Sequence, residues 1–171
     1  MFKLNFKSLN AVVPIVPSTP LSSIVAGRFD FQVRVCIIHL WTVPADRNRP
    51  TEIGSIQMLL LDEKSGKIHA TVRKDLIPIF KDQLEEGSAY VFENLMVGNC
   101  DQSYKAAEHK FKLNFMKSTK VFKVTAPEIA RYHFDFVGFK DILSAPDDKN
   151  RLLDVIGHIV EKNEPKETYY F

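Results

Sequence analysis

The sequence has little of what catalytic and metal-binding sites are built from. Only two cysteines, Cys36 and Cys100, occur among 171 residues, and neither lies in a CxxC or Cys/His spacing. The five histidines lie on separate segments without HxH or HExxH spacing, so no metal site and no cofactor are expected. No P-loop, serine elbow or pair of catalytic carboxylates is present either. We therefore expect a protein that is not an enzyme, in a reducing compartment.

Long apolar runs are also missing. Pro14, Pro17 and Pro20 interrupt the first twenty residues, which makes them a poor signal peptide. No run approaches the roughly 20 apolar residues that a membrane helix needs. The composition, 45% hydrophobic and 26% charged, is that of a globular domain with one core and a short extension.

The net charge of +2 is small, but its distribution is uneven. Residues 1–124 hold 17 Lys and Arg against 12 Asp and Glu, whereas residues 125–171 hold 6 against 9. The basic character therefore lies in the part of the chain where strands are predicted, which favours an anionic partner for that part.

Residues 52–74 carry the clearest structural pattern. An apolar run over 56–61 meets a turn sequence over 62–66, in which Asp62 and Glu63 suit turn chemistry better than acid catalysis. Over 67–73, apolar residues then alternate with Lys67, His69 and Arg73. This pattern predicts a β-hairpin whose second strand has one buried and one basic face.

The flanking patterns predict the rest of a small barrel. In order they indicate a strand over 31–41, a polar loop over 42–52, a helix over 75–86, a strand over 88–97, a second polar loop over 98–108, and strands over 109–116 and 120–124. This order is that of an OB-fold, an all-β, five-stranded Greek-key barrel with one helix between its third and fourth strands. We expect an irregular lead-in over 1–20 and the barrel over 21–124.

Several stretches resemble a known family. DEKSGKIHATVRKDLIPIFKDQLEEGSAYVFENLMV and HKFKLNFMKSTKV, followed by FDFVGFKDIL and LLDVIGHIV, look like the large subunit of replication protein A, especially its plant-type members. The resemblance implies a first central OB domain that binds single-stranded DNA in the nucleus, in replication, repair or recombination. It also implies a linker over 125–149 and an incomplete second OB domain over 150–171. We expect its first strand, 152–160, to pack on the barrel, self-associate or bind a partner such as another replication protein A subunit.

In an OB-fold the ligand groove lies on the second and third strands and the two long loops. Basic residues there would bind phosphates, and aromatic residues would stack bases. The candidate nucleic-acid-binding residues are Arg34, Trp41, Arg47, Arg49, Lys67, His69, Arg73, Tyr90, Phe92, Lys105, Lys110 and Lys112. Trp41 and the two loop arginines are the strongest candidates, whereas Lys110 and Lys112 could equally form a solvated strand face and Phe92 could belong to the core.

Two alternatives stay open. The resemblance implies a base-stacking aromatic residue where Ile56 stands, so the barrel could be a protein-interaction module that has lost its nucleic-acid ligand. The ligand could also be single-stranded RNA, because OB grooves bind either nucleic acid and nothing in the sequence distinguishes a 2′-hydroxyl.

Overall fold

The computed structural model describes residues 17–46, 49–101, 105–144 and 152–162. In this part of the chain one sheet contains β1 (Gln32–Asp46), β2 (Arg49–Leu61), β3 (Lys67–Arg73), β4 (Ala89–Glu93), β5 (Met96–Asn99), β6 (Phe111–Asn114) and β7 (Lys120–Val124). Short helices are η1 (Leu21–Ser23), η2 (Lys74–Leu76), α1 (Ile77–Phe80) and α2 (Phe139–Ser144). None of the described helices is long and apolar enough to span a membrane.

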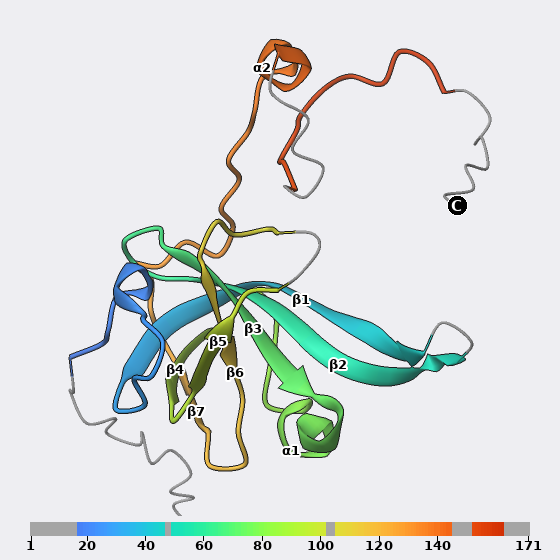
Figure 1. Ribbon diagram of the computed structural model, residues 1–171. Helices are drawn as coiled ribbons and strands as arrows, with labels where there is room; N and C mark the ends of the chain where they lie inside the picture. The colour runs from blue at the N-terminus through green and yellow to red at the C-terminus, as the bar shows by residue number, and fades with distance from the viewer. Residues whose placement is uncertain (1–16, 47–48, 102–104, 145–151, 163–171) are drawn as a thin grey trace, which may run out of the picture.

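The sheet curls until its two ends are formed by the same two chain segments. The strand order is β5-β6-β3-β2-β1-β4-β7, in which only the β3–β6 pair is parallel. β4 and β5 are consecutive in the chain, and so are β6 and β7 (Figure 1). At one end of the order β5 and β6 lie beside β3, and at the other end β4 and β7 lie beside β1. This is the barrel topology that the sequence predicts, with α1 between β3 and β4.

Asn94 explains why two strands replace the single strand predicted over 88–97. It has a φ of 58°, a left-handed conformation that asparagine tolerates better than most residues and that interrupts a strand. Its side-chain amide donates to the carbonyl of Ser118 at 3.1 Å, and its own carbonyl accepts from the Thr119 hydroxyl at 2.7 Å. The bend lets β4 pair with β7 while β5 pairs with β6.

The β2–β3 turn is held by the Asp62 side chain. Its carboxylate accepts from the backbone N–H of Leu21 at 2.8 Å, of Lys64 at 3.0 Å and of Gly66 at 2.7 Å. A side chain on Gly66 would meet this carboxylate at 3.1 Å. The structural role predicted for Asp62 is therefore confirmed, and the turn also anchors η1 to the barrel.

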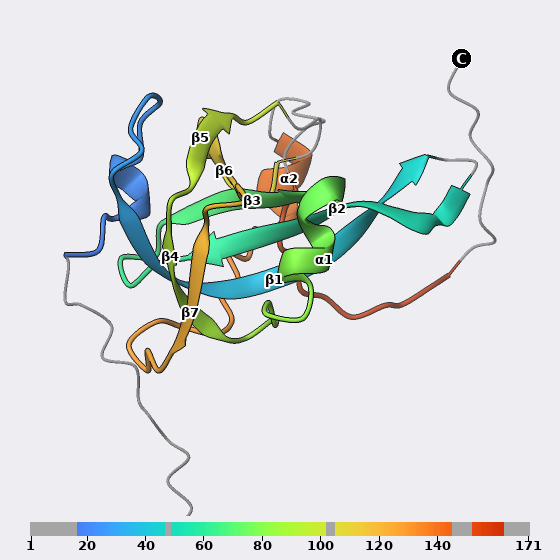
Figure 2. The same ribbon diagram turned by 90° about the horizontal axis from the view of Figure 1, so that it is seen from below.

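The predicted polar loop over 42–52 is wrong. The strands β1 and β2 continue through this segment as a long hairpin that projects from the barrel (Figure 2). The register shifts around Pro44, which has no N–H to give to the ladder. The absence of a side chain at Gly54 allows the hairpin to close, because a Cβ there would lie 2.6 Å from the Cα of Ala45.

The helix predicted over 75–86 is also shorter than expected. It begins as η2, and α1 ends at Phe80, after which the backbone N–H of Gln83 bonds the carbonyl of Phe80 in a turn. Its predicted apolar positions Leu76, Phe80 and Leu84 are all buried against the barrel core. The 3.6-residue spacing thus identified the buried face correctly but overestimated the length of the helix.

The segment after β7 remains packed on the barrel for several residues. Ala126 and Ile129 are buried, so the packed unit continues past the boundary expected at 124. No strand forms over 152–160; the described residues there make one parallel bridge, between Phe136 and Asp154. The helix α2 buries no residue, and Ile159 and Val160 are 83% and 93% exposed.

Candidate nucleic-acid interface

The strands present one face to the core and the opposite face, called the outer face below, away from it. One row of directly paired residues crosses five strands on this outer face: Trp41 on β1, Gln57 on β2, Thr71 on β3, Asn114 on β6 and Met96 on β5. The next row towards the hairpin tip contains Val43, Ser55 and Arg73. These two rows form what we call the open end of the outer face.

The open end has a polar floor between exposed apolar side chains. Thr71 donates its hydroxyl to Oε1 of Gln57 at 2.8 Å, and the Gln57 amide donates to Oγ of Ser55 at 2.9 Å. Trp41 and Met96 stand at the two ends of the row with 37% and 39% of their surface exposed. An exposed tryptophan beside a polar floor can stack a planar base while its neighbours hydrogen-bond polar edges.

The other end of the same face, called the covered end, is an apolar cluster. The outer-face residues Cys36, Ile38, Leu59 and Leu61 are all buried. They lie under Ala107 from the loop after β5 and under Ala126 and Ile129 from the segment after β7. Burial raises the pKa of the Cys36 thiol, so this cysteine packs as a small apolar side chain.

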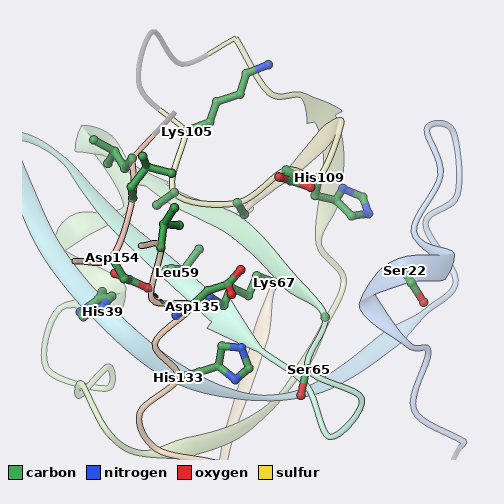
Figure 3. Close-up of a pocket in the computed structure, with 17 residues that line it drawn as sticks. Ser22, His39, Leu59, Ser65, Lys67, Lys105, His109, His133, Asp135 and Asp154 are labelled. Atoms are coloured by element: carbon green, nitrogen blue, oxygen red, sulfur yellow. Dashed lines mark hydrogen bonds between the residues drawn. The ribbon is translucent and has the colours of Figure 1, made fainter. Parts of the chain in front are cut away.

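A cleft of about 540 Å³ borders the covered end (Figure 3). Its walls come from the β2–β3 turn, the loop over 105–109, and the later segments 133–137 and 152–154. Lys67 and Lys105 line it together with Asp135 and Asp154, so its charges are mixed. Among the described residues, no three His, Cys, Asp or Glu side chains gather in a group that could hold a metal ion.

His69 lies between the two ends and is only 1% exposed. Its Nε2 accepts a hydrogen bond from the backbone N–H of Ala106 at 3.1 Å, which ties the loop over 105–109 to β3. The Trp41 ring meets it edge-on, with centroids 6.3 Å apart. Burial, and secondarily the positive charge of Lys112, lowers the pKa of His69, so the neutral ring is favoured. His69 therefore supports the face rather than forming part of its surface.

The structure places the predicted cations around the face but pairs several of them. Arg73 lies in the open end, 68% exposed, with Asp75 at 3.9 Å. Arg49, on the hairpin, contacts Glu52 at 3.0 Å. Lys112 bonds Asp101 at 2.5 Å and lowers the pKa of that carboxyl through this hydrogen bond. A pair exposed on both sides, such as Arg73 and Asp75, is weak enough for a phosphate to compete with the carboxylate. Lys110 is exposed just before β6, and Arg47 lies outside the described residues.

Three predicted site residues do not contribute to the open end. Tyr90 and Phe92 are fully buried in the barrel core, stacked on each other with centroids 5.4 Å apart, because their alternation in β4 turns both inward. Arg34 is ion-paired with Glu128 and donates to the carbonyl of Thr125 at 3.1 Å, so it anchors the segment after β7. Ile56 also points into the core, and its identity therefore has no bearing on base stacking in this chain.

Sequence reasoning missed the polar floor. Gln57 lies in the apolar run over 56–61, where polar and apolar residues do not alternate cleanly. Leu59 and Leu61 are on the outer face but are apolar, because they are buried at the covered end. Asn114 and Met96 sit on strands whose pairing partners are distant in sequence. The alternation along β2 could have identified Gln57, because it lies two residues from Leu59 and therefore on the same side of the strand. It is paired with Thr71 on β3.

Known proteins share this fold. A Schizosaccharomyces pombe protein, Replication factor A protein 1, is 28% identical over 129 residues, which are 68% of this chain and 20% of that protein. A chain of a replication protein A heterotrimer bound to single-stranded DNA aligns with a TM-score of 0.57 and 17% identity over 75% of this chain and 30% of that one. DNA-binding domain A of Saccharomyces cerevisiae replication protein A aligns with a TM-score of 0.47 and 18% identity, over 64% of this chain and 95% of that one.

The curled sheet and its strand order define an OB-fold protein, as predicted. The chain belongs to the family described as "Domain of unknown function DUF223", whose sequence profile matches residues 24–145. The resemblance to the large subunit of replication protein A is likewise confirmed. The chain spans about a fifth of the length of its curated fission-yeast relative.

Proposed function

We propose that this protein binds single-stranded nucleic acid, with DNA favoured, at the open end of the outer face and without catalysis. The observation that carries the proposal is Trp41, the sole tryptophan, which stands exposed at the end of the polar row Gln57–Thr71–Asn114. A base stacked on an exposed aromatic ring is worth roughly 1–3 kcal/mol by alanine substitution. The polar floor would then contact sugar, phosphate or base edges beside it.

Cations near the same end support an anionic ligand. Arg73 belongs to the open end, Lys112 lies one row away on β6, and Arg49 extends from the hairpin. The carboxylate partners of Arg73 and Lys112, Asp75 and Asp101, are 59% and 78% exposed, so a phosphate can replace them at low cost. The affinity should therefore fall as the salt concentration rises, with a modest slope of log K against log salt. The part of the binding free energy that comes from stacking should not depend on salt.

The similarity to proteins named for replication supports a role in DNA replication, and we extend it to repair or recombination in the nucleus. The same similarity supports other replication protein A subunits as partners, since the structural relative is a heterotrimer. Self-association through 152–160 belongs to this proposal too, because Val155, Ile156 and Ile159 are exposed there. Light scattering after size-exclusion chromatography measures it directly, and a mass of one chain at all concentrations would exclude it.

The test of the ligand is a titration of fluorescently labelled oligonucleotides at two salt concentrations. We expect tighter binding to single-stranded DNA than to a duplex of the same length, because stacking needs exposed base faces. Equal affinity for the duplex would indicate electrostatic attraction alone. Preference for RNA of the same sequence would reassign the ligand, and no binding at low salt would favour the protein-interaction module.

A further inference from the structure

Two segments that follow the barrel in sequence come back to lie beside its outer face. Residues 133–137 and 152–154, together called the cover below, line one wall of the cleft at the covered end (Figure 3). They are joined by two hydrogen bonds, from Val137 N–H to the carbonyl of Asp154 at 3.0 Å and from Asp135 N–H to the carboxylate of Asp154 at 2.9 Å. Asp154 is thus the residue that holds the cover together.

The cover stands over the continuation of the proposed ligand path. The cleft that it lines also contains His39 and Leu59, which form the outer-face row next to that of Trp41 and Gln57. A strand that extended from Trp41 along the face in this direction would therefore meet the cover after one row. The second row of the open end, with Val43, Ser55 and Arg73, lies on the other side of Trp41, and none of these three residues lines the cleft.

The cover brings two carboxylates to a cleft whose barrel wall carries two lysines, Lys67 and Lys105, and one carboxylate, Glu108. Asp135 and Asp154 line the same cleft as Lys67 and Lys105, two cations that the sequence assigns to phosphate binding. Carboxylates that share a cleft with such cations compete with phosphates for them.

The cover is also weakly attached to the barrel. Among the described residues, one hydrogen bond links its backbone to the barrel, from Leu152 N–H to the carbonyl of Lys105 at 3.0 Å. Phe136 is 51% exposed and Leu152 56% exposed, so the cover buries little apolar surface. Removing it from the face would therefore cost far less than unfolding the barrel.

We propose that the cover is an autoinhibitory element that limits the length of single strand the outer face accepts. A short strand binds at the open end with the cover in place, and a longer strand has to displace the cover to reach Lys67 and Lys105. This inference rests on the proposed function, because it concerns the same binding face.

The test compares two double variants of the full chain. Asp135→Asn with Asp154→Asn removes the two carboxylates that the cover brings to the cleft while keeping side-chain size. Asp141→Asn with Glu161→Gln is the matched control, because it removes the same charge from the same tail at exposed residues that do not line the cleft. The probes are labelled oligothymidines of about 4 and about 16 nucleotides, the range of site sizes known for OB folds.

We expect the cleft variant to bind the longer oligonucleotide about fivefold more tightly than the wild type and the control variant do. A factor of about five corresponds to the net free energy of one hydrogen bond. The shorter oligonucleotide should bind all three proteins equally. Hydrogen exchange supplies a second measurement, because Val137 and Leu152 have hydrogen-bonded amides in the free protein. Their exchange should accelerate when the longer oligonucleotide is bound and stay unchanged with the shorter one.

Equal affinity of the cleft variant and the control for the longer oligonucleotide would overturn the cover proposal and leave the proposed function intact. So would continued protection of the Val137 and Leu152 amides in the complex. Absence of binding to both oligonucleotides in all three proteins would instead overturn the proposed function, and the cover proposal with it.

Discussion

The two ends of the outer face are built on the same strands but have opposite characters. At the covered end, Leu59 and Leu61 of β2 are buried under the loop after β5 and the segment after β7. At the open end, the same strand presents half-buried Ser55 and Gln57 beside exposed Trp41. The period of a strand thus determines which face a residue is on, whereas elements distant in sequence determine whether that face is covered. One end contributes to stability, and the other is available for a ligand.

The largest expected effect separates the two ends by stability. Leu61→Ala should lower the free energy of unfolding by roughly 2–5 kcal/mol, because it leaves a cavity in the cluster of the covered end. Met96→Ala at the open end, where the side chain is already 39% exposed, should change it by less than about 0.5 kcal/mol. Chemical denaturation of both variants measures the difference, and similar losses would contradict the division of the face.

The second effect separates the ends by binding. Trp41→Ala should weaken single-strand binding by roughly 1–3 kcal/mol while leaving the fold intact, and the loss should be nearly independent of salt. Tyr132→Ala is the matched control, since Tyr132 is an aromatic residue that is 69% exposed and lines a pocket with Cys36 beside the covered end, not the open end. Fluorescence anisotropy with a labelled oligonucleotide gives both affinities. An equal loss in the two variants would remove Trp41 from the site.

A third effect concerns His69, which links the two ends. Its pKa is lowered from 6.5 in the folded protein, by burial first and by Lys112 second. The unfolded chain therefore binds the proton more readily, so stability is complete above pH 6.5 and declines as the pH falls below 6.5 towards the lowered pKa. Protonation of Nε2 would also remove the acceptor for Ala106 N–H.

Thermal melts between pH 8 and pH 5 measure this contribution of His69. His69→Gln should remove that part of the pH dependence, whereas the matched variant of an exposed histidine, His39→Gln, should retain it. A pH profile of His69→Gln identical to that of the wild type would show that His69 does not link the loop to β3 in this way.

The smallest effect is electrostatic. Arg73→Ala at the open end should lower the slope of log K against log salt by roughly 0.7 if the side chain makes one phosphate contact on a single strand. Arg28→Ala, an arginine before β1 that is paired with Asp30, should leave the slope unchanged. Titrations at several salt concentrations compare the two, and equal slopes would assign the basic character of the barrel to general attraction.

Local patterns predicted most of the fold and only part of the site. Alternation and turn chemistry located β2, β3, β6 and β7, because each is encoded by its own residues. The extension of the hairpin through Pro44 and the bend at Asn94 depend on backbone pairing between distant segments, which local patterns do not contain. The prediction for Tyr90 and Phe92 is wrong because aromatic residues suit both a core and a stacking surface, and which face of β4 is buried depends on its pairing between β1 and β7.

The intrinsic fluorescence of Trp41 reports directly on ligand binding at the open end, because this is the sole tryptophan in the chain and it stands there. Titration of the unmodified protein with a short unlabelled single-stranded oligonucleotide should quench this fluorescence in a saturable manner, with the same midpoint as binding followed by anisotropy. The equivalent duplex should not quench it at that concentration. Saturable binding that leaves the Trp41 emission unchanged would show that the ligand occupies a surface other than the open end.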